Sequence, residues 1–224
     1  MSKKYSYFFI FSILVFFFLF VSSSYLNTSD NIHQQGFNTK YNVYSVLKPA
    51  DLKFANEKVP NISHDVWERL DKELLKNIYW QSNTMLYFKR ANKYFPIIED
   101  ILAKNNIPDD FKYLALIESG FEYTVSPSGA AGFWQIMRGT AREYGLEVNY
   151  AIDERYNLKK STEAACKYLK KAYQEFGSWT MAAAAYNMGI NGVRRNIKKQ
   201  GTNNYFNLHL NDETSRYVFR IIVI

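Results

Sequence analysis

The sequence is poor in the residue types that build metal centres and disulfide frameworks. Its 224 residues contain a single cysteine, Cys166, which excludes an intramolecular disulfide and any cysteine-based zinc or iron–sulfur site. The three histidines, His33, His64 and His209, are widely spaced, and this argues against a histidine-rich metal site. Neither a G-x-G-x-x-G nor a Walker motif occurs, so nucleotide chemistry has no support. We therefore expect no metal and no cofactor.

Apolar and aromatic residues, in contrast, are plentiful. Hydrophobic residues make up 47% of the chain and aromatic residues 17%, against 22% charged residues. A hydrophobic core can therefore form, and wholesale disorder is excluded. The length allows one domain of ordinary size, with or without a small appendage.

The N-terminus has the layout of a secretory signal peptide. Two lysines precede an uncharged, apolar run from Tyr5 to Val21, and a serine triplet follows it. We therefore predict a signal peptide at residues 1–24 and a linker arm, rich in Asn, Ser and Lys, at residues 25–60. Because the run is at the short end of what crosses a bilayer, the alternative is an uncleaved anchor that associates the protein with a membrane. Both interpretations predict an exported protein of the periplasm or cell envelope.

The charge balance is modestly positive. Lys and Arg outnumber Asp and Glu by 28 to 21, and removal of the two leader lysines leaves 26 − 21 = +5. Such a balance suits an extracytoplasmic polymer that bears carboxylates or phosphates, or serves solubility alone. Basic doublets such as Lys159-Lys160 and Arg194-Arg195 lie in segments with helical periodicity. We assign them to solvated helix faces and expect no nucleic-acid partner.

From residue 61 onward the pattern is helical nearly throughout, and β-hairpin signals are scarce. Apolar residues recur every three or four positions after Ser63, after Met85 and after Pro108, and the second of these helices is expected to bend or break near Pro96. A capping box formed by Thr140 and Glu143 predicts a short helix at 140–143. Other periodic or capped segments predict further helices, at 158–176, 179–187, 190–199 and from 211 or 212 onward. The sequence thus predicts a mostly α domain at 61–224.

One carboxylate stands at the end of an apolar helical stripe. Phe111, Leu114, Ala115 and Glu118 follow one another at i, i+3, i+4 and i+7, which places them on one helix face. Burial of such a glutamate disfavours its charged form and raises its pKa. A neutral carboxylic acid is what general acid catalysis on an acetal oxygen needs. The alternative is a helix-terminal glutamate that points into solvent, and this interpretation is preferred for a glutamate considered on its own.

Two further segments supply space and polar groups. The small residues of the loop Ser126–Gly132 leave room for a bulky ligand and expose backbone amides to it. Trp134, just after the loop, is either a sugar-stacking face or a core residue. The alanines at 182–185 permit close helix packing, and Tyr186 and Asn187 follow them at a helix end. A tyrosine in this position is by itself most often part of the core.

Taken in order, these segments resemble the lytic transglycosylases with a soluble-lytic-transglycosylase (SLT) domain, most closely the branch of membrane-bound lytic murein transglycosylase D. The resemblance extends over roughly residues 67–218. Four motifs carry it: Ile117-Glu-Ser119, Gly129-Ala-Ala-Gly-Phe-Trp-Gln-Ile136, Ala184-Ala-Tyr-Asn187 with Gly189, and Glu213-Thr-Ser-Arg-Tyr-Val218. It implies a lysozyme-like helical domain with a glycan-binding groove and a catalytic core at about 95–220.

The resemblance also implies roles for individual residues. Glu118 matches the single catalytic acid/base of the family. Five residues match substrate-binding positions: the loop serine Ser126, the groove-floor residue Gln135, the groove-lining pair Tyr186 and Asn187, and Tyr217 near the catalytic carboxylate. Arg138 departs from the proline that is usual after the Gln-Ile-Met segment. The chain stops at Ile224 without the wall-binding LysM repeats of the branch, so we expect either a minimal catalytic form or part of a longer chain.

The activity that the resemblance implies is cleavage of the β-1,4 bond between N-acetylmuramic acid and N-acetylglucosamine in the glycan strands of peptidoglycan, with 1,6-anhydro-muramoyl ends. Because the substrate's own C6 hydroxyl replaces water, Glu118 needs no second carboxylate, unlike the usual glycosidase pair. The acids Glu122, Glu143 and Asp153 are then expected to be structural. If one of them positions a water, the protein is a hydrolytic muramidase of the goose-lysozyme type. The non-enzymatic alternative is a peptidoglycan-binding module.

Overall fold

The computed structural model describes residues 13, 15–17, 46–61 and 63–224. The chain divides into two units, residues 1–45 and residues 46–224. The signal peptide or anchor predicted at 1–24 lies almost entirely outside the described residues. Among the residues that are described, no helix combines the length and the apolar character that crossing a membrane requires.

The second unit begins with a short β-hairpin. Strand β1 (Lys53–Phe54) pairs antiparallel with β2 (Glu57–Lys58), and both residues of the connecting turn have positive φ, as a tight hairpin turn requires. Phe54 is 2% exposed and Val59 1% exposed, and both belong to the core. The predicted linker arm is therefore wrong for residues 46–60. Two-residue strands are too short to show an alternating pattern, so this segment carried no strand signal.

Helices form most of the remaining domain, and the mostly α prediction is confirmed. In chain order they are α2 (His64–Tyr79), α3 (Gln81–Lys104), α4 (Phe111–Ser119), α5 (Arg138–Glu143), α6 (Leu158–Phe176), α7 (Trp179–Met188), α8 (Ile190–Gln200) and α9 (Asp212–Ile222). Two 3₁₀ turns complete the described elements, η1 (Glu154–Tyr156) and η2 (Tyr205–Asn207).

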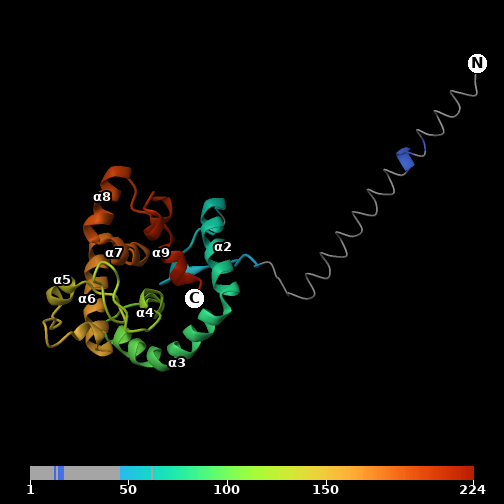
Figure 1. Ribbon diagram of the computed structural model, residues 1–224. Coiled ribbons are helices and arrows are strands. Elements are labelled where there is room, and N and C mark those ends of the chain that lie inside the picture. The colour runs from blue at the N-terminus through green and yellow to red at the C-terminus, as the bar shows by residue number, and fades with distance from the viewer. Residues whose placement is uncertain (1–12, 14, 18–45, 62) are drawn as a thin grey trace, which may run out of the picture. The chain divides into compact units, whose positions relative to one another are not determined.

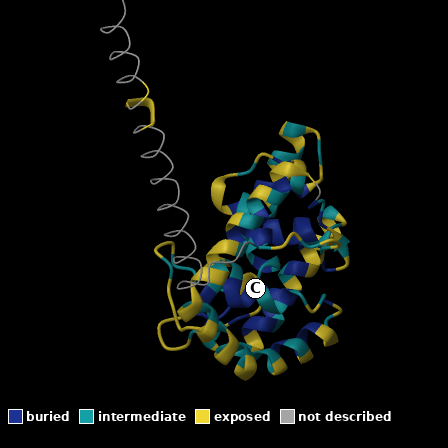
Figure 2. Ribbon diagram, turned by 90° about the vertical axis from the view of Figure 1, so that its right-hand side faces the viewer, coloured by how far each residue is buried: buried dark blue, intermediate teal, exposed yellow. Residues whose placement is uncertain are grey.

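Helix α7 lies at the centre of the packing. It contacts α6, α8 and α9, while α3 packs against α4 and α6 (Figure 1). The alanines at 182–185 are fully buried, and their small side chains let the neighbouring helices approach closely. Buried residues accordingly fill the interior of the domain, and exposed residues lie on the outer faces of the helices (Figure 2).

Local signals account for several helix boundaries. Asn157 caps α6 through a hydrogen bond from the Lys160 amide, and Gly177 ends the helix in the left-handed conformation. Of the bend or break expected near Pro96, the break is wrong, because α3 continues through this exposed residue, where water can satisfy the carbonyl that a proline leaves unbonded. Helix α5 begins at Arg138 and not at a Thr140 cap.

Candidate active site

Glu118 lies in the last turn of α4. The apolar face of this helix is buried in the core, and Gly120 ends the helix with φ of 58°. The stripe carries the Glu118 side chain inward, where the hydroxyl of Tyr217 from α9 donates a hydrogen bond to its Oε1. Tyr217 is only 1% exposed, whereas Glu118 is half-buried. The alternative of a solvent-pointing glutamate is therefore wrong.

The surroundings of Glu118 raise the pKa of its carboxyl from the ordinary value of 4.5 to about 7. Burial is the largest cause, since it penalises the charged form. The hydrogen bond from Tyr217 and the positive charge of Arg220 lower the pKa, and the nearby carboxylate of Glu213 raises it. Near neutral pH the group is present in both protonation states, so it can both give and take a proton.

Ser119 fixes the chain that leaves this helix. Its hydroxyl donates to the Phe133 carbonyl (2.9 Å) and accepts from the Phe121 amide (3.1 Å). The residue after the acid thus ties α4 to the far side of the small-residue loop. Within that loop, the Ser126 hydroxyl accepts a hydrogen bond from the Ala130 amide (3.0 Å) and helps to close a turn.

Arg155, which the sequence analysis did not single out, holds the same loop in place. Its Nη1 donates to the carbonyls of Gly129 (2.8 Å) and Ile136 (3.0 Å), and its side chain is paired with Asp153 at 2.7 Å. The hydrogen bonds from Arg155 also lower the pKa of Asp153. Gly132 has φ of 78°, and a Cβ there would lie 2.0 Å from the Arg155 carbonyl oxygen. The loop therefore needs glycine at 132, and Asp153 has a structural role.

Gln135 is held in an unusual backbone conformation. Its φ is 45°, and its Nε2 donates to the carbonyls of Thr124 (3.1 Å) and Gly132 (3.0 Å). The neighbouring Trp134 is fully buried, and its indole N–H donates to the Thr162 hydroxyl at 2.8 Å. Of the two interpretations of this tryptophan, the core residue is the one that the structure supports.

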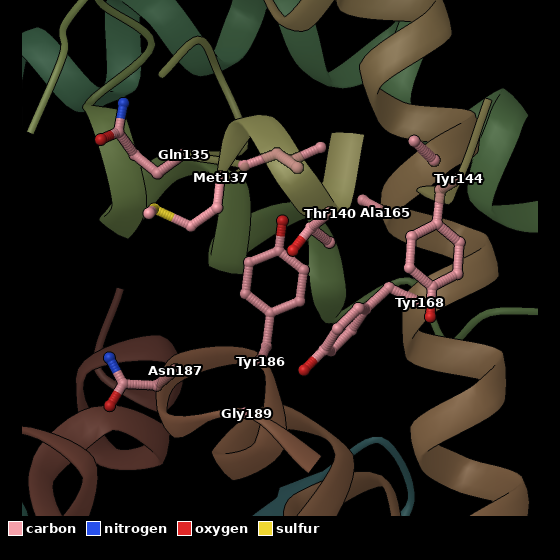
Figure 3. A pocket seen from close by; sticks show the side chains of 11 residues that line it. Gln135, Met137, Thr140, Tyr144, Ala165, Tyr168, Tyr186, Asn187 and Gly189 are labelled. Atoms are coloured by element: carbon pink, nitrogen blue, oxygen red, sulfur yellow. The ribbon is translucent and has the colours of Figure 1, made fainter. Parts of the chain in front are cut away.

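A cavity of about 180 Å³ lies between the segment 135–144 and helices α6 and α7. Side chains that line it include Gln135, Met137, Tyr144, Tyr168, Tyr186 and Asn187. Figure 3 shows Tyr186 rising from α7 toward the segment above it, between Asn187 and Tyr168. The Tyr186 hydroxyl donates to the Trp134 carbonyl at 2.8 Å. Burial, followed by the charge of Glu118, raises the pKa of Tyr186 well above 10, so this phenol stays protonated.

The structure brings some of the predicted site residues together and keeps others apart. Glu118 and Tyr217 are hydrogen-bonded, and Tyr186 lies within electrostatic reach of Glu118. Three predicted residues share the cavity, namely Gln135, Tyr186 and Asn187. Glu118 and Ser126 are not part of its lining.

Glu213, which stands in the last of the four sequence motifs, lies beside the predicted site residues. It is exposed on α9, and its Oε1 accepts a hydrogen bond from Asn187 at 2.9 Å. The Asn187 side chain also accepts from the Thr214 hydroxyl (2.6 Å), which links α7 to the start of α9. The position of Asn187, two residues after the alanine run, gave no hint of its contact with Glu213, because Glu213 lies 26 residues away in the sequence.

The other acids named from the sequence are engaged in ion pairs. Glu122 is paired with Arg90 at 2.5 Å and Glu143 with Lys171 at 3.0 Å. Within the described part of the chain, no group of three or more His, Cys, Asp or Glu residues could hold a metal ion.

Comparisons with known proteins show the family of the chain. The family model for the transglycosylase SLT domain matches residues 95–209. Over 163 residues the chain is 31% identical to membrane-bound lytic murein transglycosylase D of Escherichia coli (strain K12), an alignment that covers 70% of this chain and 35% of that protein. The same figures hold for the protein of that name from Escherichia coli O6:H1.

A third relative is a protein of Alteromonas sp. (strain M-1) that is named for resistance to tributyltin chloride. It is 31% identical over 139 residues, which cover 60% of this chain and 67% of that protein. The chain spans 35% of the length of the two Escherichia coli relatives. The family match includes the end of α4 with Glu118, the small-residue loop and the α7 pair Tyr186 and Asn187. The chain belongs to the transglycosylase SLT domain family.

Proposed function

We propose that the protein is a lytic transglycosylase that cleaves the β-1,4 bond between N-acetylmuramic acid and N-acetylglucosamine in peptidoglycan and leaves 1,6-anhydro-muramoyl ends. The observation that carries the proposal is the state of Glu118, a half-buried carboxyl with a pKa of about 7 and a tyrosine donor on its oxygen. Membership of the SLT family and the names of the Escherichia coli relatives support the same reaction.

In the first step the protonated Glu118 gives its proton to the glycosidic oxygen. The bond from that oxygen to the anomeric carbon breaks, and the substrate's N-acetyl group supports the positive charge at this carbon. Glu118 is now a carboxylate, which the hydrogen bond from Tyr217 stabilises. The fully buried phenol of Tyr217 is a suitable permanent donor, because burial and the neighbouring carboxylate raise its pKa well above 10.

In the second step the Glu118 carboxylate takes the proton of the muramoyl C6 hydroxyl. The C6 oxygen then bonds to the anomeric carbon of the same sugar, which closes the 1,6-anhydro ring and restores the protonated acid. The hydroxyl belongs to the substrate and is already close to the reacting carbon, so its effective concentration exceeds that of water. A pKa near 7 lets one group serve both steps.

The cavity beside Tyr186 is the proposed place for a sugar ring next to the bond that is cut. Gln135, Tyr186 and Asn187 line it and offer amide and phenol groups to sugar hydroxyls. Ser126 is proposed to contact the strand from the small-residue loop. In this loop its hydroxyl is partly exposed, and within the described residues it donates no hydrogen bond.

Glu213 favours one alternative, a hydrolytic muramidase of the goose-lysozyme type. Its carboxylate is exposed and close enough to Glu118 to raise the pKa of that group. A base that positions water opposite a general acid would need such a location. Glu122, Glu143 and Asp153 are poorer candidates for this role because each is held in an ion pair.

Product analysis separates the reactions. Purified sacculi are digested, and the fragments are reduced with borohydride and weighed. Anhydro ends are lighter by one water and resist reduction, whereas hydrolytic ends gain two hydrogens. A majority of reducible ends would replace the transglycosylase with a muramidase. If Glu118→Gln binds the strands, and neither this variant nor the parent protein cleaves them, the protein is a binding module and not an enzyme.

We infer further that the protein is exported and works in the cell envelope, where peptidoglycan lies. The two lysines and the apolar run at the N-terminus support export, and the name of the Escherichia coli relatives supports a membrane-associated location. Fractionation of cells that produce the full chain, with N-terminal sequencing of the recovered protein, distinguishes a cleaved leader from a retained anchor. Recovery in the cytoplasm with an intact N-terminus would overturn this proposal.

A further inference from the structure

A second and larger cavity, of about 610 Å³, lies among α2, α3, α4 and α9. Three aromatic residues and three cations contribute to its lining: Tyr79, Trp80, Tyr87, Lys76, Arg216 and Arg220. Trp80 is 62% exposed, at the junction of α2 and α3, so its ring is open to a ligand. All three aromatic residues precede residue 95, where the family match begins.

The charges in this cavity leave it positive. Among the described residues the one acidic side chain in its lining is Glu73, which is 3% exposed and accepts hydrogen bonds from Lys76 (3.2 Å) and Arg216 Nε (2.6 Å). Arg216 also pairs with Asp212 at 3.3 Å, but Asp212 does not line the cavity. In the lining itself one carboxylate therefore faces three cations. Arg220 donates to the Ile117 carbonyl at 3.1 Å, and within the described part of the chain it has no carboxylate within ion-pair distance. Its remaining N–H groups can bind an anion in the planar, two-pronged manner of arginine.

The cavity adjoins the catalytic carboxyl. Ile117, which contributes to its wall, is the residue before Glu118, and the Arg220 that bonds to Ile117 is close enough for its charge to act on Glu118. Tyr186 of the sugar cavity also lies within electrostatic reach of Glu118. A strand cleaved at Glu118 would thus have one neighbouring cavity rich in amide and phenol groups and a second rich in cations.

We infer that the cavity lined by Trp80, Arg216 and Arg220 binds a carboxylate-bearing peptide stem of the glycan strand, beside the bond that is cut. This inference rests on the proposed function. The cations match the carboxylates of a stem, and the open tryptophan face matches its apolar parts. A bare glycan carries no peptide carboxylate, so a cavity for sugar alone would not need an excess of cations over acids.

The test compares strands with intact peptide stems and strands from which an amidase has removed the stems. Cleavage of both is measured at pH 5, where Glu118 is protonated, for the parent protein and for Trp80→Ala and Lys76→Met, whose side chain also lines the cavity. We expect KM for stem-bearing strands to rise about ten-fold, which corresponds to about 1.4 kcal/mol, with kcat unchanged. Cleavage of stem-free strands should stay at the level of the parent protein.

Arg195→Met is the matched control, because it removes the same charge from an exposed position on α8. It should leave both substrates unaffected. Trp80→Ala changes an exposed side chain and guards against a folding defect in Lys76→Met, and circular dichroism checks both. Equal losses on the two substrates, or no loss on either, would overturn the inference.

Binding of the same two kinds of strand to Glu118→Gln keeps this inference separate from the proposed function. If the protein binds strands but does not cut them, the proposed function fails, whereas a preference for stem-bearing strands that Trp80→Ala abolishes still supports the cavity. If cleavage proceeds as proposed but Glu118→Gln binds both strands equally well, the cavity has no role in stem recognition.

Discussion

Replacement of Glu118 by glutamine should abolish cleavage and at the same time stabilise the protein above neutral pH. The folded-state pKa of this carboxyl is about 7, whereas its ordinary value is 4.5. Between these values the folded protein binds more protons than the unfolded chain, so the free energy of unfolding falls as pH rises. The contribution of Glu118 to the unfolding free energy is greatest below pH 4.5 and is lost as the pH rises through 7. The glutamine variant stays neutral and lacks this decline.

The size of the effect follows from the two pKa values. They differ by about 2.5, and each unit corresponds to about 1.4 kcal/mol, so the parent protein loses about 3 kcal/mol between pH 4 and pH 8 through this group. Glutamine keeps the shape of the side chain and can still accept the hydrogen bond from Tyr217. Urea unfolding of both proteins at several pH values measures the difference in unfolding free energy.

A matched control is Glu143→Gln, which removes an exposed carboxylate from α5 that is paired with Lys171. Its unfolding free energy should follow the pH dependence of the parent protein within about 0.5 kcal/mol, because exposed ion pairs contribute little. If the difference between Glu118→Gln and the parent protein is the same at pH 4 and pH 8, burial does not hold the acid neutral, and the argument for its catalytic state is wrong.

Three further predictions test the support of the site. Cleavage should fall as pH rises, because Glu118 loses its proton. Tyr217→Phe removes a hydrogen-bond donor from the carboxylate, so the pH at which cleavage falls should be higher by about one pH unit in a pH–rate profile. An unchanged pH–rate profile would contradict the role of the phenol. Gly132→Ala places a Cβ 2.0 Å from a backbone oxygen and should lower the unfolding free energy, measured by thermal unfolding, by at least about 3 kcal/mol. Gly177 has φ of 67° and open space around it, so Gly177→Ala should lower the unfolding free energy by only about 1 kcal/mol. Similar decreases in the two variants would refute the close contact. The carboxylate of Glu57 accepts hydrogen bonds from the first amides of α7, at 2.5 Å and 3.0 Å. Glu57→Gln weakens these bonds and should lower the unfolding free energy by about 1–2 kcal/mol in urea titration. An unchanged unfolding free energy would show that the hairpin does not support this helix.

The helices that the sequence predicted best are those with local start and stop signals. The helix expected at 158–176 has these bounds in the structure, since Asn157 caps it and Gly177 ends it through contacts within a few residues. The capping box expected at Thr140 did not form, because the chain already becomes helical at Arg138. Short-range preferences therefore decide a boundary only where tertiary contacts do not override them.

The Glu118 stripe is the part of the site that residue spacing alone predicted. Spacings of three and four residues place Phe111, Leu114 and Glu118 on one helix face whatever the rest of the fold, because the α-helix repeats every 3.6 residues. The roles of Ser126, Gln135, Tyr186, Asn187 and Tyr217 came from the family resemblance. The chemical roles of these residues remain proposals that the experiments above address.

The sequence by itself thus determined that the chain is mostly helical, belongs to the SLT family and carries one carboxylate at the end of an apolar stripe, and its N-terminus predicts export. Only the tertiary structure decided the chemical state of that carboxylate, because its pKa depends on burial and on groups from α9 that are about 100 residues away in the chain. The same holds for Glu57, which binds the start of α7 from 122 residues away, and for Arg155, which holds the loop before it. Contacts of this kind arise from packing between elements, and the local preferences of a sequence carry no record of which partners packing will bring together.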